Sequence, residues 1–290
     1  MFNAILTINL LMLIAMVIRW RIDIKSERPP YSKTDLLDFI AVVLACFFTY
    51  LLHNYIPFIS SVLASAGVGL LGSLFAKDHE KAIYAGSFAG MAALTVFPMV
   101  PFAFLALVVG LVFVLTKPLF KGVGGKLGTV AFVGALFIGL LWNAPFSTGI
   151  HFNDFELFAL IAIGIFAAIL TRLLSNKIKI SVVFSSSLVG VFLALIFDYL
   201  PFGLSPYLAI CGFGASFVGM SDETQIKSWF LLGLGGLFFS IIYASGMGVL
   251  GGAGGKLGTS AFIASSAVIG LIQLFPKKKS SGSEVINSTK

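Results

Sequence analysis

Charged residues are scarce in this sequence, at 11% of 290 residues. A soluble domain carries about a quarter charged residues, whereas here 58% of the residues are hydrophobic and the mean hydropathy is +1.03. The few charges are gathered between apolar runs of roughly 17–23 residues, the length at which a helix crosses about 30 Å of hydrocarbon. The composition therefore argues against a soluble globular domain and predicts an all-α, polytopic membrane protein.

Cysteines and buried acids are also few. The two cysteines, Cys46 and Cys211, both lie inside apolar runs, so a disulfide framework is not expected. None of the twelve acidic residues lies in the middle of an apolar run, although proton and cation carriers usually hold a buried carboxylate. The H-E-x-x-H and G-x-S-x-G motifs do not occur. We therefore expect no enzyme, cofactor or metal site, and a cation pump is disfavoured.

Eleven apolar runs can be counted along the chain. They lie at about 2–18, 39–55, 57–76, 82–99, 101–118, 127–145, 157–174, 180–198, 205–220, 228–247 and 257–275. The loops between them are too short to form a soluble domain with its own core. We therefore predict about eleven transmembrane helices.

The basic residues fall on one side of this predicted topology. If residues 20–38 are cytoplasmic, strict alternation places eighteen of the nineteen Lys and Arg residues on that side, and only Lys256 on the other. This distribution follows the positive-inside rule. It predicts a protein of the cytoplasmic (inner) membrane with the N-terminus outside and the C-terminus in the cytoplasm. It also explains the net charge of +7 by the lipid bilayer, with no nucleic-acid partner.

Two segments recur at nearly one spacing. The nine residues 124–132 (GGKLGTVAF) match 254–262 (GGKLGTSAF) at eight positions, at an offset of 130. The residues 84–91 (YAGSFAGM) match 213–220 (FGASFVGM) at an offset of 129. We predict an internal duplication with five-helix units at 39–146 and 157–276. Because five is odd, the units are expected to have inverted topology. An N-terminal helix and linker at 1–38 and a disordered tail at 277–290 flank them.

The repeated Gly-Gly-Lys segments are the main candidate site. A lysine near the bilayer interior is costly and therefore a functional candidate. A helix beginning near Thr129 or Thr259 would add a capping hydroxyl and free N–H groups, which together favour an anion. Leu127 and Leu257 follow the lysines, which excludes a phosphate-binding P-loop. The predicted substrate-binding residues are Gly124, Gly125, Lys126, Thr129, Gly254, Gly255, Lys256 and Thr259. Interfacial snorkelling is the alternative for Lys126, and it explains Lys256 less well.

The second repeated segment holds Ser87 and Ser216, each followed by a phenylalanine. As functional groups these paired hydroxyls would line a solute path and also bind substrate, and Phe88 and Phe217 would act as hydrophobic gates. The small residues around them also suit close helix packing without any transport role. Both interpretations stay open at the level of sequence.

The inverted duplication and the unusual Lys256 favour a transport protein. We expect a channel or secondary carrier for a small anionic or polar solute, with its path between the two units. Two alternatives remain: a non-transporting scaffold or assembly subunit, and a carrier of lipids or lipid-linked substrates. Self-association into a homo-oligomer is also left open.

Overall fold

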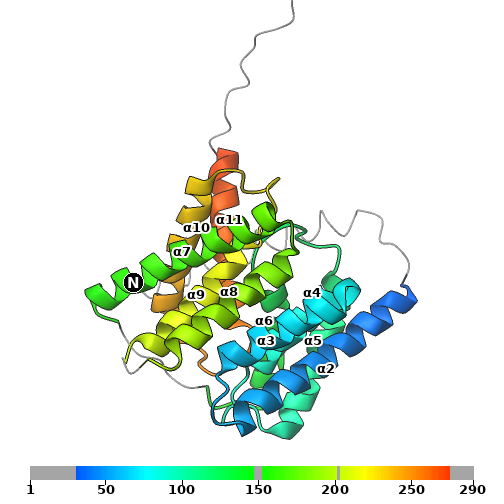
Figure 1. Cartoon of the computed structure of the whole chain (residues 1–290). Helices are drawn as coiled ribbons and strands as arrows, with labels where there is room; N and C mark the ends of the chain where they lie inside the picture. Colours follow the sequence, from blue (N-terminus) through cyan, green and yellow to red (C-terminus); the bar gives the residue numbers. More distant parts are fainter. Residues whose placement is uncertain (1–30, 147–151, 201–202, 275–290) are drawn as a thin grey trace, which may run out of the picture.

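The computed structural model describes residues 31–146, 152–200 and 203–274, and within them the protein is all-α (Figure 1). The described residues form ten α-helices and one 3₁₀ turn. These elements are α2 (Lys33–Tyr55), α3 (Ser61–Phe75), η1 (Lys77–His79), α4 (Glu80–Gly90), α5 (Met99–Thr116), α6 (Lys126–Leu141), α7 (Asp154–Ile178), α8 (Val182–Phe197), α9 (Ser205–Gly219), α10 (Trp229–Gly246) and α11 (Lys256–Leu274). The expected helical class is therefore confirmed.

Five of these helices are long and apolar enough to cross a membrane, namely α2, α5, α7, α10 and α11. Four further apolar helices, α3, α6, α8 and α9, are shorter, at 15 or 16 residues. The predicted first span, 2–18, lies outside the described residues. The count of eleven spanning helices is therefore not reached in the described part of the chain.

The apolar run at 82–99 is not one helix, contrary to the prediction. Helix α4 ends at Gly90 and α5 begins only at Met99. The side chain of Asn54 holds the intervening loop, since its amide donates to the Ala92 carbonyl at 3.1 Å and its carbonyl accepts from the Leu94 N–H at 3.0 Å. These hydrogen bonds replace the backbone bonds of a helix. The backbone polar groups of Ala92 and Leu94 are therefore paired, even though the side chains of the loop are apolar.

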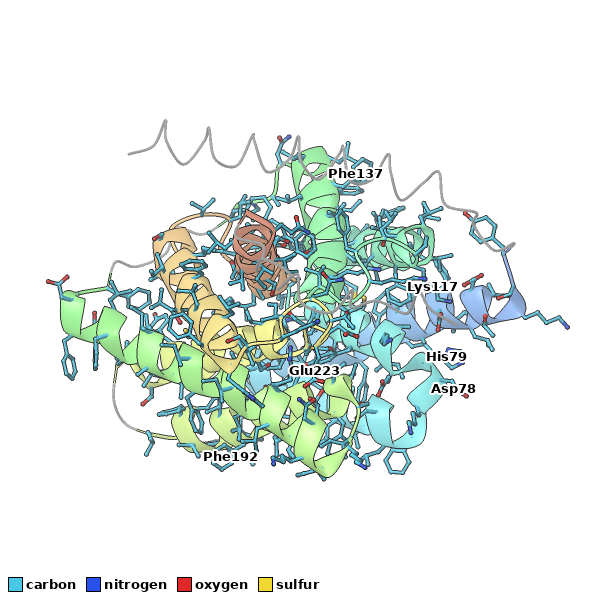
Figure 2. All side chains as sticks on the ribbon, turned by 90° about the horizontal axis from the view of Figure 1, so that it is seen from above. Asp78, His79, Lys117, Phe137, Phe192 and Glu223 are labelled. Atoms are coloured by element: carbon cyan, nitrogen blue, oxygen red, sulfur yellow. The ribbon has the colours of Figure 1, made fainter. Side chains whose placement is uncertain are left out.

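Large apolar side chains cover much of the surface. Phe137 on α6 and Phe192 on α8 are about half exposed and point outward on opposite sides of the molecule (Figure 2). Exposed apolar surface on this scale marks an interaction surface. Together with the five long apolar helices, it fits a protein embedded in a lipid bilayer.

The helices form two groups that lie side by side, α2–α6 in blue to green and α7–α11 in green to red (Figure 1). Helix α3 packs against α8, and α6 against α11, across the boundary between the groups. The packing within each group is alike: α2 packs on α4 as α7 packs on α9. Glycines permit these approaches, because a Cβ at Gly90 would lie 2.6 Å from the Cys46 carbonyl oxygen and one at Gly219 would lie 2.5 Å from the Ala168 carbonyl oxygen.

Candidate functional site

Each Gly-Gly-Lys segment is a loop that turns directly into a helix. The loops before α6 and α11 share one backbone pattern, with positive φ at three positions. These are Phe120, Gly122 and Gly125 in the first loop (48°, 77° and 83°) and Leu250, Gly252 and Gly255 in the second (52°, 84° and 82°). Glycine adopts positive φ without the steric cost that Phe120 and Leu250 bear, so the turn favours glycine at its other two positions.

The two helices begin at the lysines, not near the threonines. Helix α6 starts at Lys126, with Gly125 as its N-cap, and α11 starts at Lys256. The Thr129 hydroxyl donates to the Gly125 carbonyl at 3.1 Å and so does not cap the helix. The predicted capping role of Thr129 and Thr259 is therefore wrong: the left-handed glycine turns the chain one helical turn earlier.

Both lysines fold back over their own loops. The Lys126 Nζ donates to the carbonyl of Lys117 at 2.9 Å and to that of Leu119. The Lys256 Nζ donates to the Val249 carbonyl at 2.5 Å. Leu119 and Val249 stand 130 residues apart, like the lysines themselves. Each lysine is half-buried and lies at the N-terminal end of a helix, where the positive charge of the ammonium and the partial positive charge of the helix end add.

The two segments, 130 residues apart, meet in the structure. A Cβ at Gly258 would lie 2.3 Å from the Gly128 Cα, and one at Gly128 would lie 2.6 Å from the Gly258 Cα. The neighbouring glycines fit equally tightly, since a Cβ at Gly124 would lie 2.3 Å from the Phe217 carbonyl oxygen and one at Gly254 would lie 2.4 Å from the Ala89 carbonyl oxygen. The helices α6 and α11 thus cross with their backbones in contact, which only glycine allows.

Two cavities lie beside this crossing. The first, of about 840 Å³, is lined by Lys126 and also by Gly124, Gly125, Lys81, Lys117 and Lys121; we call it the Lys126 cavity. The second, of about 550 Å³, is lined by Lys256 and also by Gly255, Gly258, Ser60, Tyr207 and Tyr243; we call it the Lys256 cavity. The predicted lysines therefore line separate cavities and do not share one.

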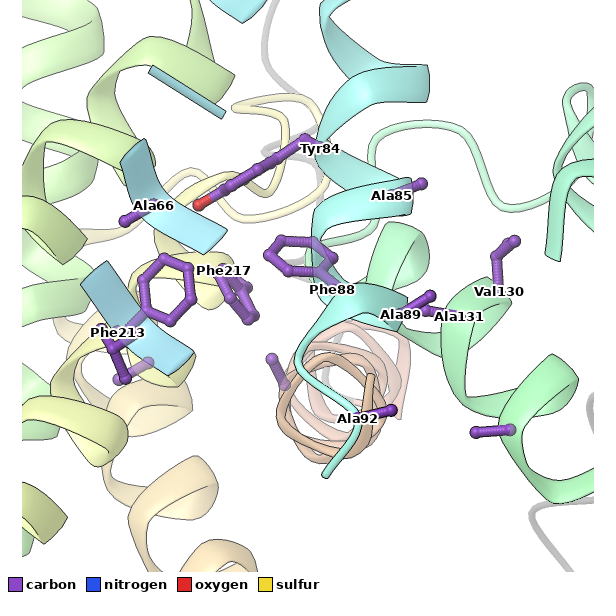
Figure 3. Packing of buried hydrophobic residues seen from close by; sticks show 14 of the residues in the cluster. Ala66, Tyr84, Ala85, Phe88, Ala89, Ala92, Val130, Ala131, Phe213 and Phe217 are labelled. Atoms are coloured by element: carbon purple, nitrogen blue, oxygen red, sulfur yellow. The ribbon is translucent and has the colours of Figure 1, made fainter. Parts of the chain in front are cut away.

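Phe88 and Phe217 line both cavities. Their ring centroids are 4.6 Å apart, and the rings face one another between α4 and α9 (Figure 3). Tyr84 and Phe213 extend the same aromatic cluster. Both phenylalanines are almost fully buried, at 3% and 1% exposure. The pair is thus the shared wall between the two cavities.

Ser87 and Ser216 lie next to these phenylalanines, but neither lines a cavity. Both are fully buried. The Ser87 and Ser65 hydroxyls are hydrogen-bonded at 3.0 Å, and those of Ser216 and Ser186 at 2.7 Å. Their position is that of interhelical hydrogen bonds, joining α3 to α4 and α8 to α9.

An ion cluster at the Lys126 cavity was missed in the sequence. Lys117 lies 2.5 Å from Asp38 and 2.6 Å from Asp35, and His79 lies 2.6 Å from Asp38; Lys117 and His79 are seen near α2 in Figure 2. Burial alone would lower the pKa of Lys117, but its hydrogen bonds to Asp35 and Asp38 outweigh this effect and raise that pKa. Asp38 lies one residue before the predicted span at 39–55. The sequence therefore places it in the linker and does not indicate the cluster.

Arg172 has a structural role that the positive-inside pattern does not predict. Its side chain is 4% exposed and donates to the carbonyls of Gly219 (3.3 Å), Ile226 (3.1 Å) and Ser221. The guanidinium thus fastens the loop that follows α9, on which Ser221 accepts from the Gly124 N–H at 3.1 Å. A buried arginine that donates to several carbonyls holds a loop in place. No sequence pattern predicts which carbonyls those are.

Tyr243 is the remaining residue that the sequence did not single out. It lies on α10, lines the Lys256 cavity and is 2% exposed. A tyrosine in an apolar run has no feature in the sequence that marks it as functional.

The chain was also compared with known proteins. No protein-family model, curated protein or solved structure matches it.

Proposed function

We propose that the chain is an integral membrane transport protein, a channel or a carrier, for a small anion. The solute passes from one cavity to the other between the two helix groups, across the Phe88–Phe217 pair. The observation that carries this proposal is the position of that pair, whose two rings line both cavities. A hydrophobic constriction that closes a pore by excluding water is a common form of gate.

We further propose that residues 39–146 and 157–276 are duplicated units of inverted topology. Contacts that recur at the repeat spacing support this. The Gly122 carbonyl accepts from the Asp222 N–H at 2.8 Å, while the Gly252 carbonyl accepts from the Ala93 N–H at 3.0 Å. The partners correspond at offsets of 129 and 130, so each loop binds the other unit in the same way. Units of this kind place a solute path at their interface in many transporters.

The charges of the cavities favour an anion. Four lysines and one histidine line the Lys126 cavity against three aspartates, Asp38, Asp78 and Asp222. Lys256 lines the other cavity, and no carboxylate is among its described lining residues. Each cavity also meets the N-terminal end of a helix, which carries a partial positive charge. A cavity whose lining carries an excess of positive charge concentrates anions.

The topology proposal assigns the two cavities to opposite membrane faces. Loop lysines line the Lys126 cavity, so it would open to the cytoplasm by the positive-inside rule. The Lys256 cavity would then open to the outside, with Lys256 as a base placed against that rule. A positional cost of this kind is expected where the residue serves a solute.

Anion flux through reconstituted vesicles tests the proposal. Lys126→Ala and Lys256→Ala are compared with Lys227→Ala, an exposed lysine that lines neither cavity. We expect chloride or nitrate efflux from wild-type vesicles, and a reduction of about tenfold in each cavity variant, the effect of losing a favourable charge worth about 1–2 kcal/mol. The Lys227 variant should match the wild type. Wild-type vesicles without flux, or flux unchanged in both cavity variants, would refute the proposal.

A further inference from the structure

The two cavities differ at several repeat-related positions, and one of these pairs is Phe113 and Tyr243. Tyr243 lines the Lys256 cavity, and the residue 130 positions earlier, Phe113, lines the Lys126 cavity. Phe113 is also nearly buried, at 6% exposure. A phenol therefore lines the Lys256 cavity where a bare ring lines its counterpart. A polar group at one of two corresponding positions is a candidate for specificity.

The Tyr243 hydroxyl has no hydrogen-bond partner among the described residues, although it is buried. Buried tyrosine hydroxyls normally find a partner, and leaving one unsatisfied costs about 1–3 kcal/mol. The ring itself is well supported, since it stacks on Phe239 and Phe152 with centroids 6.0 Å and 6.3 Å away. A supported ring with an unsatisfied hydroxyl beside a cavity is arranged to donate to a ligand.

Lys256 lies close to the same helix face. A Cβ at Gly246 would be 4.0 Å from the Lys256 Cε, and Gly246 follows Tyr243 by one turn of α10. The polar groups of His53 and Asn54, which also line this cavity, already bind backbone carbonyls, those of Gly90 at 3.0 Å and Ala92 at 3.1 Å. The Lys256 ammonium and the Tyr243 phenol thus line the same cavity, and the phenol hydroxyl has no protein partner among the described residues.

We propose that the Lys256 cavity holds a binding site for a small, weakly hydrated monoanion such as nitrate or thiocyanate. The N-terminal end of α11 and the Lys256 ammonium supply positive charge, and the Tyr243 hydroxyl donates a hydrogen bond. This inference rests on the proposed function for its substrate class and places the selective site in one of the two cavities.

The charge and the hydration of the ligand follow from the lining. One lysine and no carboxylate are among the described lining residues, so a dianion would bring a second negative charge without a matching lysine. Much of the remaining wall is apolar, including Ile59, Met91, Ile210 and Met247. An anion that leaves water for such walls loses hydration energy, and this loss is smallest for weakly hydrated anions. Sulfate should therefore bind far more weakly than nitrate.

Isothermal titration of the detergent-solubilised full chain with sodium nitrate, sodium thiocyanate and sodium sulfate tests the site. Tyr243→Phe removes only the hydroxyl, and Tyr199→Phe makes the same change at an exposed tyrosine whose hydroxyl donates to the Phe58 carbonyl at 3.0 Å. We expect Tyr243→Phe to weaken nitrate binding roughly tenfold or more, the size of a lost hydrogen bond to a charged group. Tyr199→Phe should leave nitrate binding unchanged.

Lys256→Gln is a second variant for the same titration, in case Tyr243→Phe does not fold. It should weaken nitrate binding by at least the roughly tenfold factor expected for Tyr243→Phe. Wild-type protein that binds neither monoanion, or that binds sulfate as tightly as nitrate, would overturn the site. Nitrate binding unchanged by Tyr243→Phe would also overturn the proposed binding site. If anion flux through vesicles is still observed, the proposed transport function is not affected by that result. Tyrosine-dependent binding without flux would support the site and refute transport alone.

Discussion

The crossing of α6 and α11 makes Gly258 the most informative single position for the fold. In Gly258→Ala the new methyl carbon would lie 2.3 Å from the Gly128 Cα and 2.9 Å from its backbone C and N atoms. Ordinary carbon contacts are about 3.5–4.0 Å. All three clashing atoms are backbone, so no side chain can rotate away. The two helices must separate by about 1 Å or more to admit one methyl group.

The expected loss is the difference of two effects. Overpacking a tight contact costs about 1–3 kcal/mol, and a backbone-to-backbone clash belongs at the upper end of that range. Replacing glycine by alanine inside a helix returns up to about 1 kcal/mol. We therefore expect Gly258→Ala to lower the free energy of unfolding by about 1–2 kcal/mol in net terms.

Gly270→Ala is the matched control, because it lies on the same helix and its Cβ would meet nothing within 4 Å. It should be as stable as the wild type or up to about 1 kcal/mol more stable. The unfolding of both variants can be followed by tryptophan fluorescence in mixed micelles with increasing denaturing detergent. Equal midpoints for Gly258→Ala and Gly270→Ala would show that the helices do not cross at these glycines.

Three further perturbations probe the surroundings of the cavities. Asp38→Asn leaves Lys117 without one of its two carboxylates, and should cost about 1–3 kcal/mol in chemical unfolding; an unchanged unfolding midpoint would contradict that cluster. Burial raises the pKa of Asp198 in the folded protein. The contribution of Asp198 to stability is therefore complete below the pKa of the unfolded chain and is lost as pH rises through the higher folded pKa. Asp198→Asn should remove this loss and flatten the pH–stability curve between those two pKa values. Phe217→Leu shrinks the wall between the cavities and should raise anion flux severalfold, whereas unchanged flux would place the barrier elsewhere.

Much of the fold could be predicted because its causes are local. Scarce charge and long apolar runs predict helices in a bilayer; the described residues are all-α, and five of their helices are long and apolar enough to cross a membrane. Helix ends were harder, as α4 shows: its apolar run continues to residue 99, but the helix ends at Gly90. The termination depends on hydrogen bonds from Asn54, a residue 36 positions earlier. A hydropathy pattern does not reveal a hydrogen-bond partner so far away in the sequence.

The candidate site divides in the same way. The Gly-Gly-Lys segments stood out because a lysine among glycines is unusual in apolar sequence, and the structure places each beside a cavity. Their helices begin at Lys126 and Lys256, three residues before the threonines expected as caps. The capping rule failed because it ranks side chains, whereas Gly125 turns the chain through its own φ of 83°. Tyr243 could not be found from the sequence, since it is distinguished only by a buried hydroxyl with no partner among the described residues.

The glycines of the two repeated segments carry two requirements at once. Gly125 and Gly255 adopt positive φ to start α6 and α11, and Gly128 and Gly258 let those helices touch. Because the helix starts and the crossing are adjacent, each lysine is held one turn from the contact between α6 and α11. A shift of one helix group against the other would therefore move the ammonium groups relative to the Phe88–Phe217 wall. Coupling between the two cavities would follow from this packing, with no need for a separate relay of residues.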